Sequence, residues 1–378
     1  MRYRTRLCVD FNVLGENFSF LKTLVPKNEI LFMVKANAYG HGMVPIVQYA
    51  NKVLGIKEFG VATIEEGAYL RDSLSNCEFE VYVFSDIQLD LGVNWNIYRS
   101  RRITPVLSRL EDLKTFLENR SYNHIPLVLK YNTGMNRLGI SDKDLEKSIG
   151  LLKKYNRTHI SHLMSHFSSS FLSINKVKKT NNQFRVFKEL KKIFRDNGIT
   201  VEKSSISNSG AIEQKFGLEE SHVRPGLILY GPSSLSSDFR EKSLWKGKNI
   251  SSLETTIIST FNVKKGDPLG YGAIPCPEDG LVGIVSIGYG DGFLSSYQGA
   301  TFSFKGHPAR VVGRISMDMA HILFPPSLKN DVHVGETFRI WGEDSSELLD
   351  LSDELKRIPY ELFCQLSPRI PRVYNLTQ

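Results

Sequence analysis

The stretch ILFMVKAN, residues 30–37, is an apolar run that ends in a lysine and small residues. A run without polar alternation is typical of a strand buried on both faces, as in a parallel sheet. A lysine at the end of such a strand either extends its amine to water or takes part in chemistry. We therefore predict a buried strand with Lys35 at its carboxyl end. The following AYGHG, with its two glycines, predicts a close backbone turn.

Further runs of β type follow at regular intervals. They are EFGVAT (58–63), VYVFS (81–85), ITPVLS (103–108), IPLVLKYN (125–132), HISHLMSHF (159–167), TVEKSSISNS (200–209) and HVRPGLILYG (222–231). Segments of helical length separate them, most clearly residues 180–198, where apolar side chains recur every three to four positions and Asn197-Gly198 provides the stop.

Strands that alternate with helices predict a parallel sheet, and eight evenly spaced units favour closure into a (β/α)₈ barrel of the TIM type. An open, doubly wound sheet is the alternative. In a barrel, functional groups lie at the carboxyl ends of the strands. The polar residues at those positions are Lys35, Arg137, His166, Asn208, Ser209 and Arg224.

The pattern changes after the polar segment 233–252. From about residue 248 onwards, short alternating runs punctuated by glycine predict a mainly β domain with one helix near 346–357. We therefore divide the chain into a barrel domain, 1–240, and a C-terminal β domain, 241–378.

Composition indicates an ordinary folded protein, with 41% hydrophobic and 23% charged residues. The net charge of +8 comes from dispersed lysines, so we expect no nucleic-acid partner. The four cysteines lie far apart, which predicts reduced thiols and no metal site. No signal peptide or membrane-length apolar run is present, so we expect a cytoplasmic protein without a membrane partner.

The segment VKANAYGHG (34–42) resembles the pyridoxal phosphate lysine motif of alanine racemases, and the likeness continues in order along nearly the whole chain. The other matching segments are KYNTGMNRLG (130–139), SHF (165–167), SNS (207–209), VRPGLILYG (223–231), LGYGA (269–273), IGYGDG (287–292), GRISMD (313–318) and PYELFCQLSPRIPR (359–372). That family combines a barrel with a C-terminal β domain, in agreement with the organisation predicted above.

The resemblance implies that Lys35 binds pyridoxal 5'-phosphate covalently and is one of two acid/base groups. Tyr271 would be the second, supplied by the partner subunit of a homodimer. Two groups suit racemisation, because a proton leaves one face of the α-carbon and returns to the other. Without the resemblance, Tyr271 would be interpreted as an aromatic packed in a turn.

The resemblance also implies the cofactor-binding set: Lys35, Tyr39, His166, Asn208, Ser209, Arg224, Gly226, Leu227 and Tyr360. Arg224 would face the pyridine nitrogen and, because arginine is not deprotonated, leave it unprotonated, which favours proton return over transamination. Simpler alternatives are an arginine that binds strand-end carbonyls and, for Ser209, a helix N-cap.

For the substrate carboxylate, the resemblance implies Arg137 and the backbone amide of Met317. Lys130 matches a position that is often carbamylated in the family, which would turn a buried cation into an anion able to orient Arg137. The alternative for Lys130 is an amine that extends to solvent.

Three positions depart from the family pattern: Ser205 replaces a histidine that usually supports the pyridine-facing arginine, Phe171 replaces an aspartate, and Ser295 replaces an arginine. Because both charges are missing together, we expect a more open or more apolar entrance.

The sequence thus predicts a racemase that interconverts L- and D-alanine, with D-alanine destined for peptidoglycan. One alternative is a racemase for serine or for several amino acids. Another is a non-catalytic barrel that binds pyridoxal phosphate for homeostasis, which the C-terminal motifs LGYGA and GRISMD argue against because they build the second base and the entrance.

Overall fold

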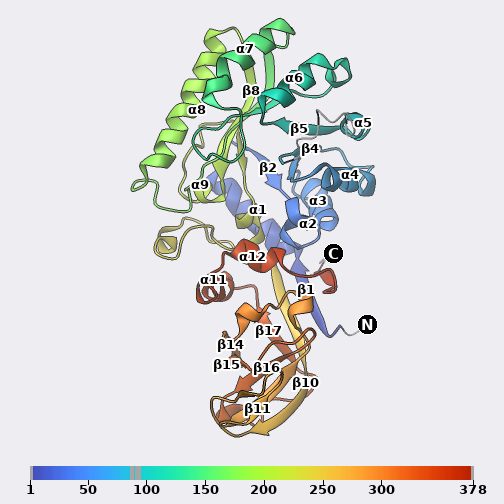
Figure 1. The fold of residues 1–378 in the computed structure, drawn as a ribbon, viewed down its shortest axis with the longest axis vertical. Helices are drawn as coiled ribbons and strands as arrows, with labels where there is room; N and C mark the ends of the chain where they lie inside the picture. Colours follow the sequence, from blue (N-terminus) through green and yellow to red (C-terminus); the bar gives the residue numbers. More distant parts are fainter. Residues whose placement is uncertain (1–2, 86–88, 90–94, 376–378) are drawn as a thin grey trace. The chain divides into compact units, whose positions relative to one another are not determined.

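The computed structural model describes residues 3–85, 89 and 95–375 (Figure 1). The chain forms two compact units. The barrel unit comprises 17–229 and 233–246, and the β unit comprises 1–16, 230–232 and 247–378. No helix among the described residues is long and apolar enough to cross a membrane.

Eight strands of the barrel unit close into a barrel of parallel strands, which confirms the predicted closure and excludes the open sheet. They are β2 (Glu29–Met33), β3 (Glu58–Val61), β4 (Glu80–Val83), β5 (Ile103–Leu107), β6 (Val128–Lys130), β7 (His159–Met164), β8 (Thr200–Asn208) and β9 (His222–Arg224). Each lies within or overlaps one of the predicted runs. The ring closes where β2 pairs with β9.

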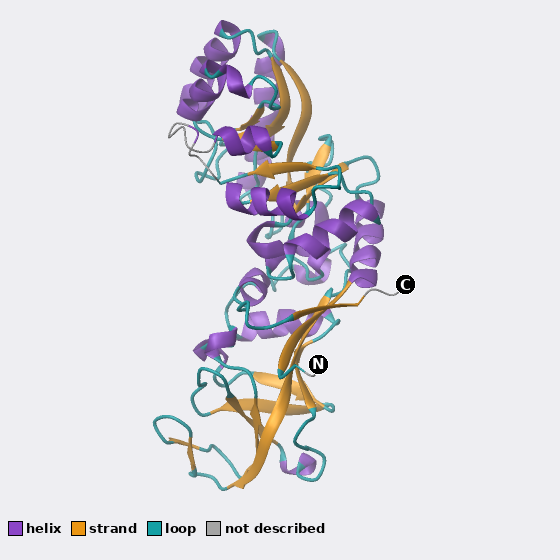
Figure 2. Ribbon diagram, turned by 90° about the vertical axis from the view of Figure 1, so that its right-hand side faces the viewer, coloured by secondary structure: helices purple, strands orange, loops and turns teal. Residues whose placement is uncertain are grey.

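Helices precede, connect and follow these strands and appear around the barrel in both ribbon views (Figures 1 and 2). They are α1 (Phe11–Leu24), α2 (Lys35–Tyr39), α3 (Met43–Lys52), α4 (Ile64–Ser73), α5 (Trp95–Ser100), α6 (Leu110–Glu118), α7 (Leu145–Lys154), α8 (Lys178–Asp196), α9 (Ser209–Glu213) and α10 (Leu227–Tyr230). The helix predicted between 180 and 198 is α8, and Gly198 follows it at a φ of +76°.

An apolar layer fills part of the barrel interior. It consists of Leu31, Tyr82, Val106, Val128 and Met164, which come from the strands β2, β4, β5, β6 and β7 and are all buried. Strands with both faces buried explain why these segments read as continuous apolar runs in the sequence.

The β unit is built on β10 (Ser251–Val263), which pairs with three strands. The sheet has the order β14-β15-β16-β13-β10-β1-β18, and β17 also pairs with β10. The remaining bounds are β1 (Thr5–Asp10), β13 (Gly280–Val285), β14 (Thr301–Phe304), β15 (His307–Val312), β16 (Ala320–Phe324), β17 (Thr337–Trp341) and β18 (Arg372–Asn375). The prediction counted the N-terminal residues with the barrel, but Thr5–Asp10 lies between β10 and β18 in this sheet.

The helix predicted near 346–357 is α11 (Ser345–Glu354), which begins where Asp344 accepts a hydrogen bond from the Ser346 amide. A second short helix, α12 (Pro359–Cys364), follows it. We did not predict α12; its proline at the first helical turn, a favourable position, was the available signal.

Part of the polar segment after the barrel folds back onto the barrel unit. The buried carboxylate of Glu213, at the end of α9, accepts hydrogen bonds from the hydroxyls of Ser233, Ser234 and Ser243 and from the Ser234 amide. These four bonds compensate for the burial of the carboxylate. They explain why residues 233–246 belong to the barrel unit.

We expect Leu31→Ala to lower the free energy of unfolding by about 2–5 kcal/mol, because it opens a cavity in the apolar layer of the barrel. Val53→Ala is the control: its side chain is 64% exposed, and the change should stay within about 0.5 kcal/mol. Urea denaturation followed by circular dichroism measures both values. Equal effects of the two substitutions would show that the layer is not tightly packed.

Candidate active site

The carboxyl ends of the barrel strands hold most of the predicted site residues. Lys35 follows β2 and Lys130 ends β6, His166 follows β7, Asn208 ends β8, and Arg224 ends β9. Closure of the barrel brings these ends to one rim, as predicted.

The backbone after Lys35 forms a left-handed turn. The strand β2 ends at Met33, and residues 36–39 have φ values of 52°, 53°, 54° and 51°. None of these four residues is glycine, and each L-residue in this conformation costs about 1–2 kcal/mol. The predicted turn is therefore present, but it begins before the two glycines and is conformationally strained.

Hydrogen bonds from neighbouring segments stabilise this turn. One carboxylate oxygen of Glu66, in the first turn of α4, accepts from the Ala36 amide at 2.6 Å, and the other accepts from the Ala62 amide at 2.7 Å. The side chain of Asn37 accepts from the Met43 amide at 2.9 Å. Glu66 thereby ties the residue after Lys35 to the carboxyl end of β3.

Tyr39, Ser209 and Gly226 form one close-packed group. A Cβ at Gly226 would lie 2.4 Å from the Tyr39 hydroxyl, so any larger residue there would force the Tyr39 side chain to move. The Gly226 amide donates to the Ser209 hydroxyl at 3.0 Å. The alternative for Ser209 as helix N-cap is wrong, because Asn208 occupies that position and accepts from the Ala211 amide. Leu227 begins α10 directly after this group.

Positive charge is concentrated around Lys130. Burial, assisted by the charges of Arg224, Arg137 and Lys35, lowers the pKa of Lys130 to about 7. The Lys130 side chain is only 6% exposed, so its amine does not extend to solvent as the alternative required. Four basic side chains around one point would suit an anionic ligand.

Arg224 is buried and firmly held. Its guanidinium donates to the hydroxyl of Ser205 and to the carbonyl of Ser165. The bond to the Ser165 carbonyl fits the simpler alternative for Arg224, an arginine that binds carbonyls at strand ends. Burial lowers the pKa of Arg224 to about 9, which leaves it charged at neutral pH.

His166 lies between Arg224 and Asn208. Its Nδ1 is 3.4 Å from a guanidinium nitrogen of Arg224, and its Nε2 is 3.4 Å from the amide nitrogen of Asn208. Burial, assisted by the charges of Arg224 and Lys130, holds the pKa of His166 well below its usual range. The imidazole is therefore neutral at pH 7.

Arg137 is exposed in a loop whose two ends are joined by backbone hydrogen bonds. The Ile140 amide donates to the Lys130 carbonyl, and the Asn132 amide donates back to the Ile140 carbonyl. The side chain of Asn132 accepts from the amides of Gly134 and Asn136. This loop keeps Arg137 within electrostatic range of Lys130.

The three other predicted residues, Tyr271, Met317 and Tyr360, belong to the β unit. Tyr271 is at the tip of the hairpin formed by β11 (Pro268–Leu269) and β12 (Ile274–Pro275), between Gly270 and Gly272 with φ values of +54° and +79°. Its side chain is 73% exposed, so the turn-packing alternative is wrong.

Met317 lies in a loop packed against the IGYGDG segment. The Tyr289 amide donates to the Ser316 carbonyl and the Gly290 amide donates to the Met317 carbonyl, at 3.0 and 2.9 Å. The Met317 side chain is 53% exposed. Tyr360 is half-buried in the first turn of α12.

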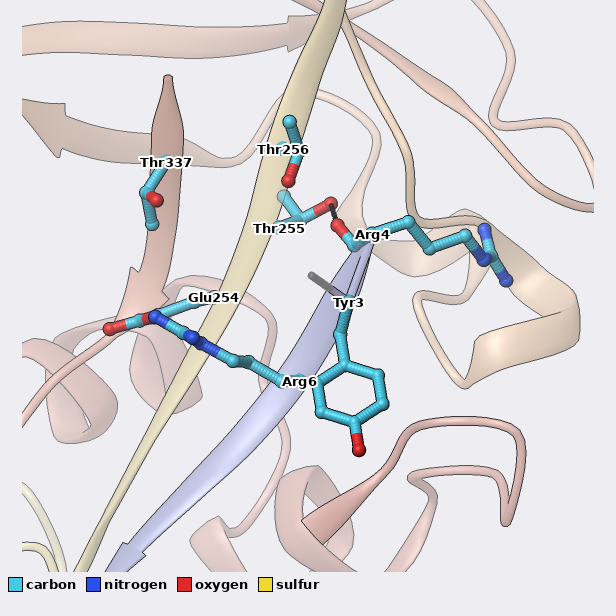
Figure 3. Close-up of a pocket in the computed structure, with 7 residues that line it drawn as sticks. All are labelled: Tyr3, Arg4, Arg6, Glu254, Thr255, Thr256 and Thr337. Atoms are coloured by element: carbon cyan, nitrogen blue, oxygen red, sulfur yellow. Dashed lines mark hydrogen bonds and ion pairs between the residues drawn. The ribbon is translucent and has the colours of Figure 1, made fainter. Parts of the chain in front are cut away.

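A polar pocket on the β unit holds none of these residues. The residues that line it are Tyr3, Arg4, Arg6, Glu254, Thr255, Thr256 and Thr337 (Figure 3). Arg6 and Glu254 form an ion pair at 2.8 Å within it. No group of three or more His, Cys, Asp or Glu side chains among the described residues could hold a metal ion, and Cys8, Cys77 and Cys276 are reduced thiols.

Sequence reasoning missed two residues that support the site. Glu66 could have been found from the capping-box spacing Thr63-x-x-Glu66, although its carboxylate binds Ala36 and Ala62 rather than the N-cap amide. His162, whose Nε2 is 2.8 Å from the Ser205 hydroxyl, gave no signal beyond its place in an apolar strand.

Comparison with known proteins gives one consistent family. The model "Alanine racemase, N-terminal domain" matches residues 9–234, and "Alanine racemase, C-terminal domain" matches residues 250–374. An alanine racemase of Nitrosococcus oceani is 30% identical over 371 residues, covering 96% of this chain and 97% of the relative.

Solved structures agree. The alanine racemase of Acinetobacter baumannii superposes with a TM-score of 0.81 at 27% identity, covering 99% of this chain and 100% of the other. That of Bartonella henselae, described with covalently bound pyridoxal phosphate, has a TM-score of 0.86 at 24% identity, with 99% and 100% coverage.

We expect Glu66→Ala to destabilise the turn after Lys35, because water replaces the charged carboxylate that accepts from the amides of Ala36 and Ala62. The cost should be about 1–3 kcal/mol in urea denaturation. Hydrogen exchange of these two amides, measured by mass spectrometry, should accelerate about tenfold or more. Glu65→Ala, at the exposed neighbouring position, is the matched control and should change neither value; protection at Ala36 in the Glu66 variant would contradict the assignment.

Proposed function

The chain belongs to the alanine racemase family, and from that premise we propose that Lys35 and Tyr271 are the two acid/base groups of its reaction. The reaction is the pyridoxal phosphate-dependent interconversion of L- and D-alanine. When bound, pyridoxal phosphate supplies the conjugated ring that makes the α-hydrogen of alanine acidic. The observation that carries the assignment is the strained turn that presents Lys35 at the rim of the barrel.

The residues at the rim fit this cofactor. Phosphate is an anion, and Lys35, Arg137 and Arg224 bring positive charge to the rim around Lys130. The group formed by Tyr39, Ser209 and Gly226 supplies hydroxyls and glycine backbone, with no room for a Cβ at Gly226. We propose that these three residues, with the Leu227 amide and Tyr360, hold the phosphate, and that His166, Asn208 and Arg224 contact the ring.

Arg224 would face the ring nitrogen as a donor. Since a guanidinium has no acceptor atom, it keeps that nitrogen unprotonated and limits the electron-withdrawing power of the ring. The buried contacts to Ser165 and Ser205 orient the guanidinium. We propose that this restraint favours return of the proton over transamination, and that Arg137 and the Met317 amide bind the substrate carboxylate.

Tyr271 and Met317 would act in the barrel of a partner subunit. The exposed position of Tyr271 on a hairpin with two left-handed glycines supports this role, because an aromatic side chain held in solvent by a constrained turn suits burial against another molecule. The protein is therefore proposed to be a homodimer with shared sites. Its cytoplasmic location and the use of its D-alanine for peptidoglycan stay predictions.

Substrate range is a separate question. Phe171 and Ser295 are uncharged, whereas the family pattern has charged residues at both positions. Phe171 is 47% exposed on the barrel unit, and Ser295 begins a short 3₁₀ turn of the β unit. A wider entrance would admit serine, and a comparison of alanine with serine and larger amino acids tests that alternative. The binding-only alternative is disfavoured because both family domains are present.

The test of the function is incubation of the protein, loaded with pyridoxal phosphate, with L-alanine in D₂O. We expect loss of the α-proton signal by NMR together with loss of optical activity. Tyr271→Phe should slow racemisation by about 10²–10⁴-fold while α-proton exchange continues from one enantiomer, because one base remains. Tyr69→Phe, an exposed tyrosine on α4, is the control. A Tyr271 variant with full racemisation would refute its role.

Mixing two inactive variants tests whether the site is shared. In a mixed dimer of Lys35→Ala and Tyr271→Phe subunits, one site has both groups intact and the other has neither. Random exchange should therefore restore about one quarter of wild-type activity. No recovery, although mixed dimers form, would mean that Lys35 and Tyr271 act within one chain.

Lys130 should be carbamylated, since its pKa of about 7 leaves a neutral amine that can attack CO₂. The new N–C bond releases a proton and yields an anion near Arg137. Incubation with ¹³C-bicarbonate at pH 8 should give a carbamate NMR signal that is absent from Lys130→Ala and weakens as the pH falls through about 7. Lys52→Ala, at an exposed position, should retain the signal. An active wild-type enzyme without the signal would refute the modification.

A further inference from the structure

Three buried polar side chains of the barrel, Arg224, Ser205 and His162, are hydrogen-bonded in series. Arg224 donates to the Ser205 hydroxyl, and the Ser205 hydroxyl lies 2.8 Å from Nε2 of His162. The three residues come from the adjacent strands β9, β8 and β7. All three are buried, with exposed fractions of 3%, 0% and 0%.

The direction of these hydrogen bonds follows from their chemistry. A guanidinium only donates, so the Ser205 oxygen accepts from Arg224 and has its own hydrogen left to give. Nε2 of His162 is the acceptor within reach. Burial holds the pKa of His162 well below its usual range, and the charges of His222, Arg224 and Lys203 add to this effect. The imidazole is therefore neutral, and a neutral ring has one nitrogen free to accept.

We propose that His162 is a positioning residue for the racemase reaction: by accepting the Ser205 hydrogen, it holds the Ser205 oxygen towards Arg224 and fixes the guanidinium. This inference rests on the proposed role of Arg224 at the cofactor ring. Donation by Ser205 also polarises its oxygen, which strengthens the bond from Arg224 in a buried setting.

The surroundings of His162 fix its ring. The ring of His222 lies 5.0 Å away, and the ring of Tyr82 meets it edge-on at 5.9 Å. His222 in turn approaches the Glu58 carboxylate at 3.4 Å, and Glu58 is paired with Lys203 at 2.7 Å. His162 thus packs against a polar cluster that holds its ring in place.

The hydrogen bonds of His162 make it possible to test its positioning role apart from any contribution to protein stability. Among the described residues, its Nδ1 has no hydrogen-bond partner. A buried imidazole with a single hydrogen bond contributes little to stability, and an apolar side chain of similar size should be tolerated there. His162→Leu should therefore fold as well as wild type and still loosen Arg224.

The experiment uses His162→Leu, His162→Gln and Ser205→Ala, each as the full chain. Two quantities are measured: the affinity of the apoprotein for pyridoxal phosphate, and the ratio of transamination to racemisation with alanine. His162→Leu should change both by about fivefold to tenfold, the effect of one lost hydrogen bond. His162→Gln should restore them, because its side-chain oxygen can accept from Ser205. His159→Leu, at the exposed start of β7, should leave both unchanged.

A double-mutant cycle gives the deciding result. If His162 acts through Ser205, the double variant His162→Leu, Ser205→Ala should behave as Ser205→Ala alone. Additive effects, or a folded His162→Leu protein with wild-type affinity and ratio, would overturn the inference. If Arg224→Ala also left both quantities unchanged, the proposed role of Arg224 would fail; an effect at Arg224 alone would reject only the role of His162.

Discussion

The pairing of β2 with β9 is the interaction on which the site depends, because it closes the barrel. Ile30 pairs with Val223, and beyond this register the Met33 amide donates to the Pro225 carbonyl at 3.0 Å. These bonds join the first and last strands of the ring. Segments nearly two hundred positions apart in the sequence then meet, and Tyr39 packs against Gly226. An open sheet would leave the two segments at opposite edges.

Closure of the barrel also brings basic side chains close together around Lys130. Without an anionic ligand, their proximity makes the free energy of unfolding depend on pH. Lys130 has a folded-state pKa of about 7, below its ordinary 10.5. Between these values the unfolded chain binds a proton that the folded chain does not, so Lys130 contributes stability that increases as the pH rises through this window. An anion at the rim would compensate the same charges at neutral pH. Binding of such an anion is therefore coupled to the stability of the barrel unit.

The sequence was informative where one local pattern determined the structure. Each barrel strand lies in or overlaps a short run of β type, so all eight could be predicted, and the helix α8 repeats its apolar residues along one face. The turn after Lys35 could not be predicted in detail, because alanine and tyrosine at positive φ contradict local preference and depend on Glu66, thirty residues away. His162 was equally hidden: its partner Ser205 lies on the next strand, and only pairing of β7 with β8 brings them together.

The place of β1 in the sheet has a consequence for how the chain folds during synthesis. Thr5–Asp10 precedes all eight barrel strands in the chain, but its partners are β10, which begins at Ser251, and β18, which ends at Asn375. The barrel strands lie wholly between these segments, so they emerge from the ribosome while β1 still lacks both neighbours. Contacts of such long sequence separation form late and slowly. β1 therefore reaches its native pairing only after the barrel strands have been made.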